Sequence, residues 1–483
     1  MQCNINTFLL GMITLLLNWA VPSEGAVQQR ANGGMRGHWE GVVQDTKVDP
    51  DIGTDLGIQM DLAFDGKEWS GTIYVPAFGE QRFALTNFLG AEQAFQFSIE
   101  DGTAGRFVGR YENNQLQGFF VRGKVASPFS CGRQACEASR RPRRPQMPVP
   151  PFPYEEQDIS YRSGEVILAG TLTIPKGEGT HPAVLFLPGS GPHDRDYSSA
   201  RHRWFLVLAD QFARVGIESL RMDSRGVGES GGSYYDTHFA QLSSDAKAGL
   251  EFLSARPEVT KDNIGLVGHC EGALVAAMTA TRSKIATFIV MLSPVGVPIE
   301  ENIVLQVQAI AARRGKSASD TADAVRQTRY LCALAKRNVP SSTVYEEAKV
   351  YLRGDRRDIS AMECDTARWW AGTETRELLT VDPSKWYSQL VVPVLVISGD
   401  HDLIVPSDKN LEAIRHSLGT PGNGDAVFCL LKNLNHTLQP AVSGLPEEII
   451  NIEQTFDPDV LRIATAWLLK TTVRTGDHEE KRR

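Results

Sequence analysis

The chain has 483 residues, more than one ordinary hydrophobic core holds, so we expect two or three domains. Hydrophobic residues make up 42% and charged residues 22%, values that are typical of a soluble globular protein and exclude a disordered or fibrous chain. The net charge of −8 is spread along the sequence, so no nucleic-acid partner is expected.

The N-terminus has the pattern of a targeting segment. Residues 8–19 form an apolar run too short to span a membrane comfortably, and Ser23, Gly25 and Ala26 supply small residues suited to signal-peptidase cleavage. Because no Lys or Arg precedes the run, a retained N-terminal anchor is the alternative. We expect a signal peptide over residues 1–25, export to a periplasm or to the medium, and no stable membrane span in the mature chain.

The cysteines bear on this expectation. Removal of the leader takes Cys3 and leaves six of the seven cysteines, some of which can pair in an oxidising compartment. Two couples are possible disulfides: Cys131 with Cys136 in a loop-like stretch, and Cys332 with Cys364 in a helical region. Cys429 falls inside an apolar strand and is predicted to be a plain buried thiol.

The first part of the mature chain is rich in short strands. Residues 34–130 show alternating patterns at near-regular spacing, separated by Gly and Asp turns, which predicts a small all-β barrel or sandwich. No catalytic cluster is visible in it, so we interpret it as a structural or docking module. The Pro- and Arg-rich residues 131–155 then predict an extended, solvated linker.

From residue 156 to about 472 strands alternate with helices, which predicts an α/β domain with a mostly parallel sheet. The predicted strands are 159–162, 166–174, 183–187, 217–222, 264–267, 287–292, 394–397 and 426–431, and the predicted helices are 204–215, 239–255 and 461–469. A charged tail over residues 473–483 is expected to be frayed.

About a hundred residues separate the strand that ends near Ser293 from the strand that starts at Val394, far more than an ordinary crossover needs. Helical patterns at 303–313, 321–336 and 342–352 predict a helical cap over about residues 297–388. We expect the cap to cover the carboxyl edge of the sheet, where open α/β sheets bind ligands.

The central chemical signal is the sequence Gly268-His269-Cys270-Glu271-Gly272, which lies between a predicted strand and a predicted helix. That context predicts a nucleophile elbow, a sharp turn that exposes its middle residue. Glycines are needed at positions 268 and 272 because side chains there would collide with neighbouring backbone. The helix N-terminus below Cys270 favours a thiolate, so Cys270 is the predicted nucleophile.

A nucleophile of this kind needs a base and an acid that orients the base. Asp402 follows the predicted strand 394–397 and is the preferred acid, with Asp400 as the competing choice. His436 follows the last predicted strand and is the preferred base. His401 is the alternative base, although it lies very close to the acid loop.

Acyl transfer also needs N–H donors for the developing oxyanion. The backbone N–H of Glu271, directly after the nucleophile, is the first predicted donor. The second is placed at Ser190, with Gly191 as its neighbour, in the loop after the strand 183–187; an ordinary Gly-Pro turn is the alternative interpretation of that loop. We expect the residues 223–230 and 194–196 to form supporting hydrogen bonds and ion pairs.

These motifs resemble the α/β-hydrolase superfamily over about residues 156–472, in the chain order nucleophile, acid, histidine. The chain looks most like exported bacterial esterases that carry a small β-rich domain before the hydrolase domain. By resemblance, Cys270, Asp402 and His436 form a catalytic triad and the substrates are carboxylic esters. Cys270 departs from the usual serine, and dienelactone hydrolases and polyhydroxyalkanoate synthases resemble the chain in having an elbow cysteine.

Three functional hypotheses follow. We favour a thiol esterase or lactonase that acts on a small-molecule ester through a thioester acyl-enzyme. The alternatives are an acyltransferase that uses the same cysteine and a catalytically impaired binding protein of the same fold. No Cys/His spacing fits zinc and no cofactor motif is present, so neither a metal nor a cofactor is expected. Trp369 and Trp370 could line a pocket in the cap, but core packing is the commoner fate of such a pair.

Overall fold

A computed structural model describes residues 35–44, 55–74, 82–90, 94–99, 105–122, 125–133, 144–354, 359, 361–419 and 425–480. Contacts within the chain define two compact units, an all-β unit and an α/β unit, which are described separately. The signal peptide predicted over residues 1–25 and the cysteine at position 136 lie outside the described residues.

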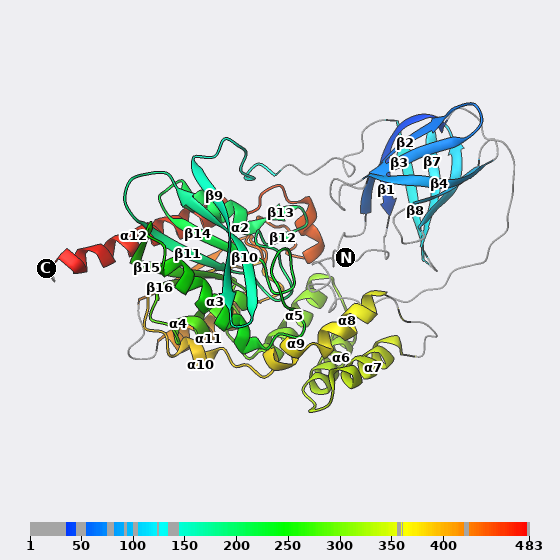
Figure 1. Ribbon diagram of the computed structural model, residues 1–483. Coiled ribbons are helices and arrows are strands. Elements are labelled where there is room, and N and C mark those ends of the chain that lie inside the picture. The colour runs from blue at the N-terminus through cyan, green and yellow to red at the C-terminus, as the bar shows by residue number, and fades with distance from the viewer. Residues whose placement is uncertain are drawn as a thin grey trace. The chain divides into compact units, whose positions relative to one another are not determined.

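The all-β unit is a closed antiparallel barrel in which each strand pairs with the next and β8 returns to β1 (Figure 1). The barrel prediction for this region is therefore confirmed. The strands are β1 (Gly37–Gln44), β2 (Asp55–Phe64), β3 (Trp69–Tyr74), β4 (Arg82–Gly90), β5 (Ala94–Ile99), β6 (Arg106–Glu112), β7 (Gln115–Arg122) and β8 (Val125–Gly132).

Aromatic side chains fill the inside of this barrel. Phe107 lies at its centre, with ring centroids 4.8 Å from Phe120, 5.0 Å from Phe129 and 5.4 Å from Phe97. Closing a sheet of eight strands leaves an interior that side chains can fill, and here they do. The packing agrees with the interpretation of this unit as a structural or docking module.

The α/β unit is built on an eight-stranded sheet in the order β18-β17-β16-β15-β11-β14-β10-β9. Strands β9 and β10 form an antiparallel hairpin, β10 pairs antiparallel with β14, and all other pairs are parallel. The strands are β9 (Tyr154–Ser163), β10 (Val166–Pro175), β11 (His181–Leu187), β14 (Glu218–Met222), β15 (Val259–His269), β16 (Ala286–Leu292), β17 (Val394–Gly399) and β18 (Ala426–Leu431).

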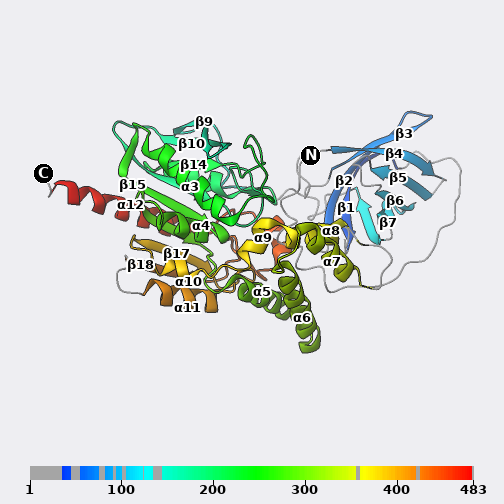
Figure 2. The same ribbon diagram turned by 60° about the horizontal axis from the view of Figure 1, so that its bottom comes forward.

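Helices cover both faces of the sheet (Figures 1 and 2). α3 (Phe239–Ser254) and α4 (Glu271–Ala280) pack on one face, whereas α2 (Trp204–Ala213) and α12 (Pro458–Glu480) pack on the other. α11 (Ser407–Leu418) contacts α10 (Ser384–Tyr387), which in turn contacts α4. The remaining short elements of this unit are β12 (Ser198–Ser199) and β13 (His202–Arg203); the 3-10 helix η5 (Pro446–Asn451) is grouped with the all-β unit by its contacts.

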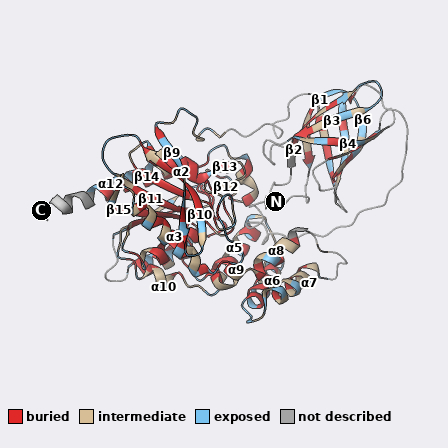
Figure 3. Cartoon of the chain, in the orientation of Figure 1, coloured by how far each residue is buried: buried red, intermediate tan, exposed pale blue. Residues whose placement is uncertain are grey.

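The central strands are buried on both sides, as their continuous apolar sequences predict. All five residues from Ala183 to Leu187 in β11 are buried, as are the six residues of β17 (Figure 3). The parallel strands end at a common edge, so the residues that follow β11, β15, β16, β17 and β18 come together there.

Between β16 and β17 the chain forms the predicted helical insertion, with more helices than the sequence patterns indicated. The helices are α5 (Ile299–Arg313), α6 (Ala318–Ala335), α7 (Ser341–Arg353), α8 (Ala361–Ala371), α9 (Thr373–Leu378) and α10. Trp370 in α8 is 1% exposed and packs edge-to-face on Trp369 at 4.6 Å, so its side chain belongs to the core.

Within the second half of the predicted linker, residues 144–146 are not a solvated spacer, whereas residues 149–151 are exposed. Arg144 donates hydrogen bonds to the carbonyl oxygens of Ala200 and Ile452, both at 3.0 Å. Gln146 donates to the carbonyl oxygen of Phe456 at 2.8 Å and accepts from its backbone N–H at 2.9 Å. Buried side-chain hydrogen bonds to backbone therefore fix residues 144–146 on the α/β unit.

Two other predictions need correction. Cys332 and Cys364 are both free thiols rather than a disulfide, while Cys429 is a half-buried thiol in β18. The backbone helix α12 continues to Glu480, through most of the stretch expected to fray. Among the helices of the described residues, none combines the length and the apolarity that crossing a bilayer requires.

Candidate active site

Cys270 lies at the turn between β15 and α4. Its backbone has φ 52° and ψ −117°, a conformation that a non-glycine residue adopts at a cost of about 1–3 kcal/mol. The N–H of Cys270 donates to the carbonyl oxygen of Leu292 at 2.8 Å, and its own carbonyl accepts from Ala273 at 3.1 Å. The strained turn leaves the thiol half-buried at the edge of the sheet.

The two glycines of the motif are dictated by close backbone contacts. A Cβ on Gly268 would lie 2.3 Å from the carbonyl oxygen of Gly272. A Cβ on Gly272 would lie 2.1 Å from the carbonyl oxygen of Leu187. Strand β11, the turn and α4 therefore approach more closely than any side chain permits, which is the geometry predicted for an elbow.

His436 and Asp402 meet beside this turn. His436 Nδ1 lies 2.8 Å from Asp402 Oδ2, and both side chains are buried. The other carboxylate oxygen of Asp402 accepts the backbone N–H groups of Ile404 at 2.9 Å and Val405 at 2.8 Å, which fixes its orientation. With Nδ1 held by Asp402, Nε2 of His436 is the nitrogen that hydrogen-bonds to Cys270.

The competing acid and base have other partners. Asp400 accepts the backbone N–H of Asn433 at 2.6 Å, and His401 Nδ1 lies 3.3 Å from the carbonyl oxygen of Ala441. The structure therefore brings together Cys270, His436 and Asp402 and leaves Asp400 and His401 in structural contacts of the loops.

The electrostatics of His436 follow from its neighbours. Burial lowers its pKa, but the charges of Asp402 and Cys270 and hydrogen bonds to both outweigh burial and raise the pKa to about 10. At neutral pH the ring is therefore an imidazolium placed between the carboxylate of Asp402 and the sulfur of Cys270.

The loop after β11 lies against the nucleophile. A Cβ on Gly189 would be 3.3 Å from Cys270 Cβ and 2.7 Å from Tyr197 Oη, so glycine permits the close approach. The N–H of Gly191 donates to Tyr234 Oη at 2.8 Å, so this N–H is already committed and does not fit the oxyanion role expected near it. Ser190 and the N–H of Glu271, the first residue of α4, stay the candidate donors.

His269 holds the backbone of His436 in place. Its Nε2 lies 2.9 Å from the carbonyl oxygen of His436, and its Nδ1 lies 2.9 Å from Tyr197 Oη. A carbonyl only accepts, so Nε2 carries the hydrogen and Tyr197 donates to Nδ1. Burial and the neighbouring charge of His436 lower the pKa of His269 well below its usual range, which keeps the ring neutral. Ser293 Oγ donates to the same carbonyl at 2.8 Å.

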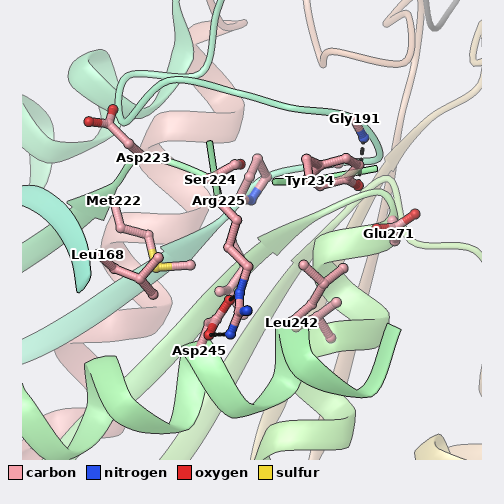
Figure 4. A pocket seen from close by; sticks show the side chains of 14 residues that line it. Leu168, Gly191, Met222, Asp223, Ser224, Arg225, Tyr234, Leu242, Asp245 and Glu271 are labelled. Atoms are coloured by element: carbon pink, nitrogen blue, oxygen red, sulfur yellow. Dashed lines mark hydrogen bonds and ion pairs between the residues drawn. The ribbon is translucent and has the colours of Figure 1, made fainter. Parts of the chain in front are cut away.

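The expected supporting network is present. Arg195 binds Asp223 with Nη2 at 2.7 Å and also reaches Glu229 at 2.8 Å, while Arg225 binds Asp245 at 2.6 Å. Figure 4 shows Arg225 and Asp245 at one side of a pocket, with Glu271 and Tyr234 at another. Within the described residues, no group of three or more His, Cys, Asp or Glu side chains is arranged to hold a metal ion.

The sequence is similar to one protein family and to a protein described as an esterase. The family described as "serine aminopeptidase, S33" matches residues 199–439, which include the elbow, Asp402 and His436. The esterase EstD from Thermotoga maritima is 28% identical over 329 residues, covering 66% of this chain and 70% of that protein. The α/β unit has the α/β-hydrolase fold, and the matched residues carry the predicted elbow, acid and base.

Two solved structures are similar to this chain at low identity. Est1E from Butyrivibrio proteoclasticus, determined with ferulic acid bound, has a TM-score of 0.40 at 14% identity, over 65% of this chain and 99% of that one. Dienelactone hydrolase from Anabaena variabilis has a TM-score of 0.35 at 15% identity, over 66% and 99% of the two chains.

Several residues around this α/β-hydrolase site were not found from the sequence. Tyr197 and Tyr234 hold the elbow histidine and the Gly191 N–H, and Glu374 of α9 reaches the elbow from the cap. None of the three lies in a motif. Tyr197 directly follows residues 194–196 and Tyr234 lies four residues after the loop 223–230, so these two lie beside stretches already assigned a supporting role, whereas Glu374 does not.

Proposed function

We propose that the chain hydrolyses carboxylic esters or lactones, with Cys270 as the nucleophile, His436 as the general acid and base, and Asp402 as the residue that orients His436. The observation that carries the proposal is the strained conformation of Cys270 beside the 2.8 Å contact of His436 with Asp402. The relationship to a protein described as an esterase supports esters as the substrate class.

The proposed reaction has two steps. The Cys270 thiolate attacks the ester carbonyl, a C–S bond forms, and the negative charge on the carbonyl oxygen is met by the N–H of Glu271 and by Ser190. The C–O bond then breaks and the His436 imidazolium gives its proton to the leaving alcohol. In the second step His436 takes a proton from water, whose oxygen cleaves the thioester to a carboxylic acid and restores the thiol.

Steady-state hydrolysis of short-chain p-nitrophenyl esters by the reduced protein tests this proposal. We expect turnover by the wild type and at least a ~1,000-fold loss in Cys270→Ala. Without the thiol no nucleophile attacks the carbonyl, so the oxyanion that the N–H donors would stabilise does not form. Cys429→Ala is the matched control, since it removes a half-buried thiol from strand β18. Undiminished turnover by Cys270→Ala would refute the assignment of the nucleophile.

The same assay separates the acyltransferase alternative. A transferase accumulates an acyl adduct that is released only when an acceptor alcohol, amine or thiol is added. If a protein whose Cys270 reacts as a free thiol shows neither an adduct nor turnover, both enzymatic hypotheses fail. The third hypothesis, a catalytically impaired binding protein, would then stand.

We further propose that the chain is exported, on the strength of its N-terminal sequence. Expression in a bacterium followed by intact-mass measurement should find a chain that begins near Ala26. Recovery of the full-length chain in the cytoplasmic fraction would argue against export.

A further inference from the structure

Two buried carboxyl groups meet between the elbow and the cap. Glu271 opens helix α4 and is 3% exposed, while Glu374 lies in α9 of the cap and is 2% exposed. The two side chains are within hydrogen-bonding reach of each other. Burying two carboxylates together is costly unless one of them carries a proton.

Glu271 accepts hydrogen bonds from the predicted oxyanion loop. Ser190 Oγ donates to Glu271 Oε2, and the Tyr234 hydroxyl also donates to this carboxylate. Tyr234 in turn accepts the N–H of Gly191 at 2.8 Å (Figure 4). Ser190 therefore contacts Glu271 directly, and Gly191 is connected to it through Tyr234. The side chain of Glu271 thus fixes the loop, while its backbone N–H is the proposed oxyanion donor.

Glu374 supplies the proton of the pair. Its Oε2 accepts Thr375 Oγ1 at 3.3 Å, whereas within the described residues no N–H or hydroxyl group donates to its Oε1. Burial, the charge of Glu271 and the hydrogen bond to Glu271 together raise the pKa of Glu374 well above its usual range. Burial also raises the pKa of Glu271, but hydrogen bonds from Ser190 and Tyr234 favour its ionised form, so Glu374 is the member of the pair that holds the proton and donates to Glu271.

Helix α9 is otherwise held by contacts away from the elbow. Glu377 accepts the N–H of Phe239 at 2.7 Å and lies 2.5 Å from His238 Nδ1. The N–H of Thr373 donates to the carbonyl oxygen of Tyr235 at 3.3 Å. These contacts dock α9 on the start of α3, and Glu374 is the residue that connects α9 to the elbow.

The charged and titratable groups around the pair come from several elements. They are Tyr234 and Tyr235 before α3, Tyr197 after β11, Glu377 on α9, and the Arg225–Asp245 ion pair across the cavity. Arg225 is committed to Asp245 at 2.6 and 2.7 Å. The neighbours that act directly on Glu374 are thus acidic or neutral and favour its protonated form.

We infer that Glu374 is a positioning residue: the proton it shares with Glu271 couples the cap to the oxyanion side of the elbow and is lost at high pH. The inference rests on the proposed function for its catalytic consequence, but the proton sharing itself is a property of the fold. Loss of the proton places two negative charges in one buried site, which separates α9 from the elbow and loosens the loop that carries Ser190.

The first test measures kcat and KM for a p-nitrophenyl ester against pH in Glu374→Gln, Glu374→Ala and the control Glu377→Gln. The glutamine amide donates to Glu271 at every pH, so Glu374→Gln should keep its kcat to higher pH than the wild type. Glu374→Ala should lose kcat by about tenfold or more, because an oxyanion donor is worth that much when misplaced. Glu377→Gln removes only the smallest of the influences that raise the pKa of Glu374, so its profile should shift far less than that of Glu374→Gln.

The rate of Cys270 alkylation by iodoacetamide measures the reactivity of the sulfur in a reaction that forms no oxyanion. We expect Glu374→Ala to be alkylated within about twofold of the wild-type rate, because the substitution disturbs only the oxyanion donors and not the thiol. An equal loss of alkylation and ester turnover would show a general disturbance of the nucleophile and would overturn the positioning role.

The second test does not depend on activity. Because the folded pKa of Glu374 is raised, its contribution to stability is present below the unfolded pKa and is lost as pH rises through the folded value. The Tm of Glu374→Gln minus that of the wild type should therefore grow between about pH 5 and about pH 9. A difference that is flat over this range overturns the proton sharing, whatever the ester assays give. If the wild type hydrolyses no ester, only the proposed function fails.

Discussion

At the scale of single residues, the assignment of Asp402 as the acid can be tested with the nearby Asp400 as its control. Asp402 Oδ2 contacts His436 Nδ1, while Asp400, two residues earlier, binds only the N–H of Asn433 in this part of the described chain. Asp402→Asn should lower kcat by about 100- to 10,000-fold, because an amide holds the wrong tautomer of the imidazole. Asp400→Asn should change kcat by less than about threefold, since its amide oxygen still accepts the same N–H.

The comparison is made by steady-state kinetics at matched protein stability. An equal loss of kcat in Asp400→Asn and Asp402→Asn would contradict the assignment of the acid.

The charge of His436 predicts a pH dependence. Its folded pKa is raised to about 10 from the usual 6.5, so the imidazolium contributes stability that is fully present below about pH 6.5 and is lost as pH rises through about 10. The free energy of unfolding of the wild type should therefore fall relative to that of His436→Gln over this window. Urea unfolding at intervals of one pH unit measures the difference, and a difference that rises with pH would be inconsistent with a buried imidazolium.

At the scale of elements, the elbow depends on close contact between three backbone segments: strand β11, the turn at Cys270 and helix α4. A Cβ on Gly272 would lie 2.1 Å from the carbonyl oxygen of Leu187 and 2.5 Å from that of Pro188. Because these are backbone atoms of a buried strand and its loop, Gly272→Ala should destabilise the protein by about 3 kcal/mol or more. Gly231→Ala is the control, since its new Cβ would meet nothing closer than 3.6 Å; its cost should stay below about 1 kcal/mol.

Thermal and urea unfolding of the two glycine variants check this prediction. Equal stability of Gly272→Ala and Gly231→Ala would mean that the strand and the elbow do not pack as described.

The strands and the elbow were accessible from the sequence because their local signals agree with their surroundings. The run from Ala183 to Leu187 is apolar without alternation, which is the pattern of a strand buried on both faces, and β11 contains it. The predicted triad could be placed because Cys270, Asp402 and His436 each follow a strand of one parallel stretch of the sheet, and parallel strands end at one edge.

The cap could be predicted as a helical insertion but not in its details. Helices α9 and α10 have six and four residues, too few for a periodic pattern to distinguish them from loops. Glu374 lies on α9, and its carboxyl group meets Glu271 only after a hundred residues of chain have folded over the elbow. Similarly, residues 144–146 pack on the α/β unit through specific hydrogen bonds that a Pro- and Arg-rich composition does not reveal.

At the scale of the whole molecule, the chain consists of two compact units that each have a core of their own. The sequence between them includes Arg140, Arg141 and Arg143, of which Arg140 and Arg143 are not followed by proline. Limited digestion with trypsin should therefore cut there and yield two fragments, one carrying the barrel and one carrying the α/β unit.

The larger fragment should keep ester turnover within about threefold of the intact chain, because every residue of the proposed site lies in the α/β unit. Mass spectrometry of the fragments and a rate measurement on the purified larger one check this. Loss of turnover in a fragment with unchanged circular dichroism would assign the barrel a part in catalysis.

The central claim is that Cys270 forms the covalent intermediate, and one measurement tests it most directly. The reduced protein is mixed with an activated short-chain ester, quenched in acid within the first turnover, and its intact mass and tryptic peptides are determined. The account predicts a mass increase of one acyl group, located on the peptide that contains Cys270, labile to hydroxylamine and absent in Cys270→Ala. Turnover without such an adduct, or an adduct on another residue, would contradict it.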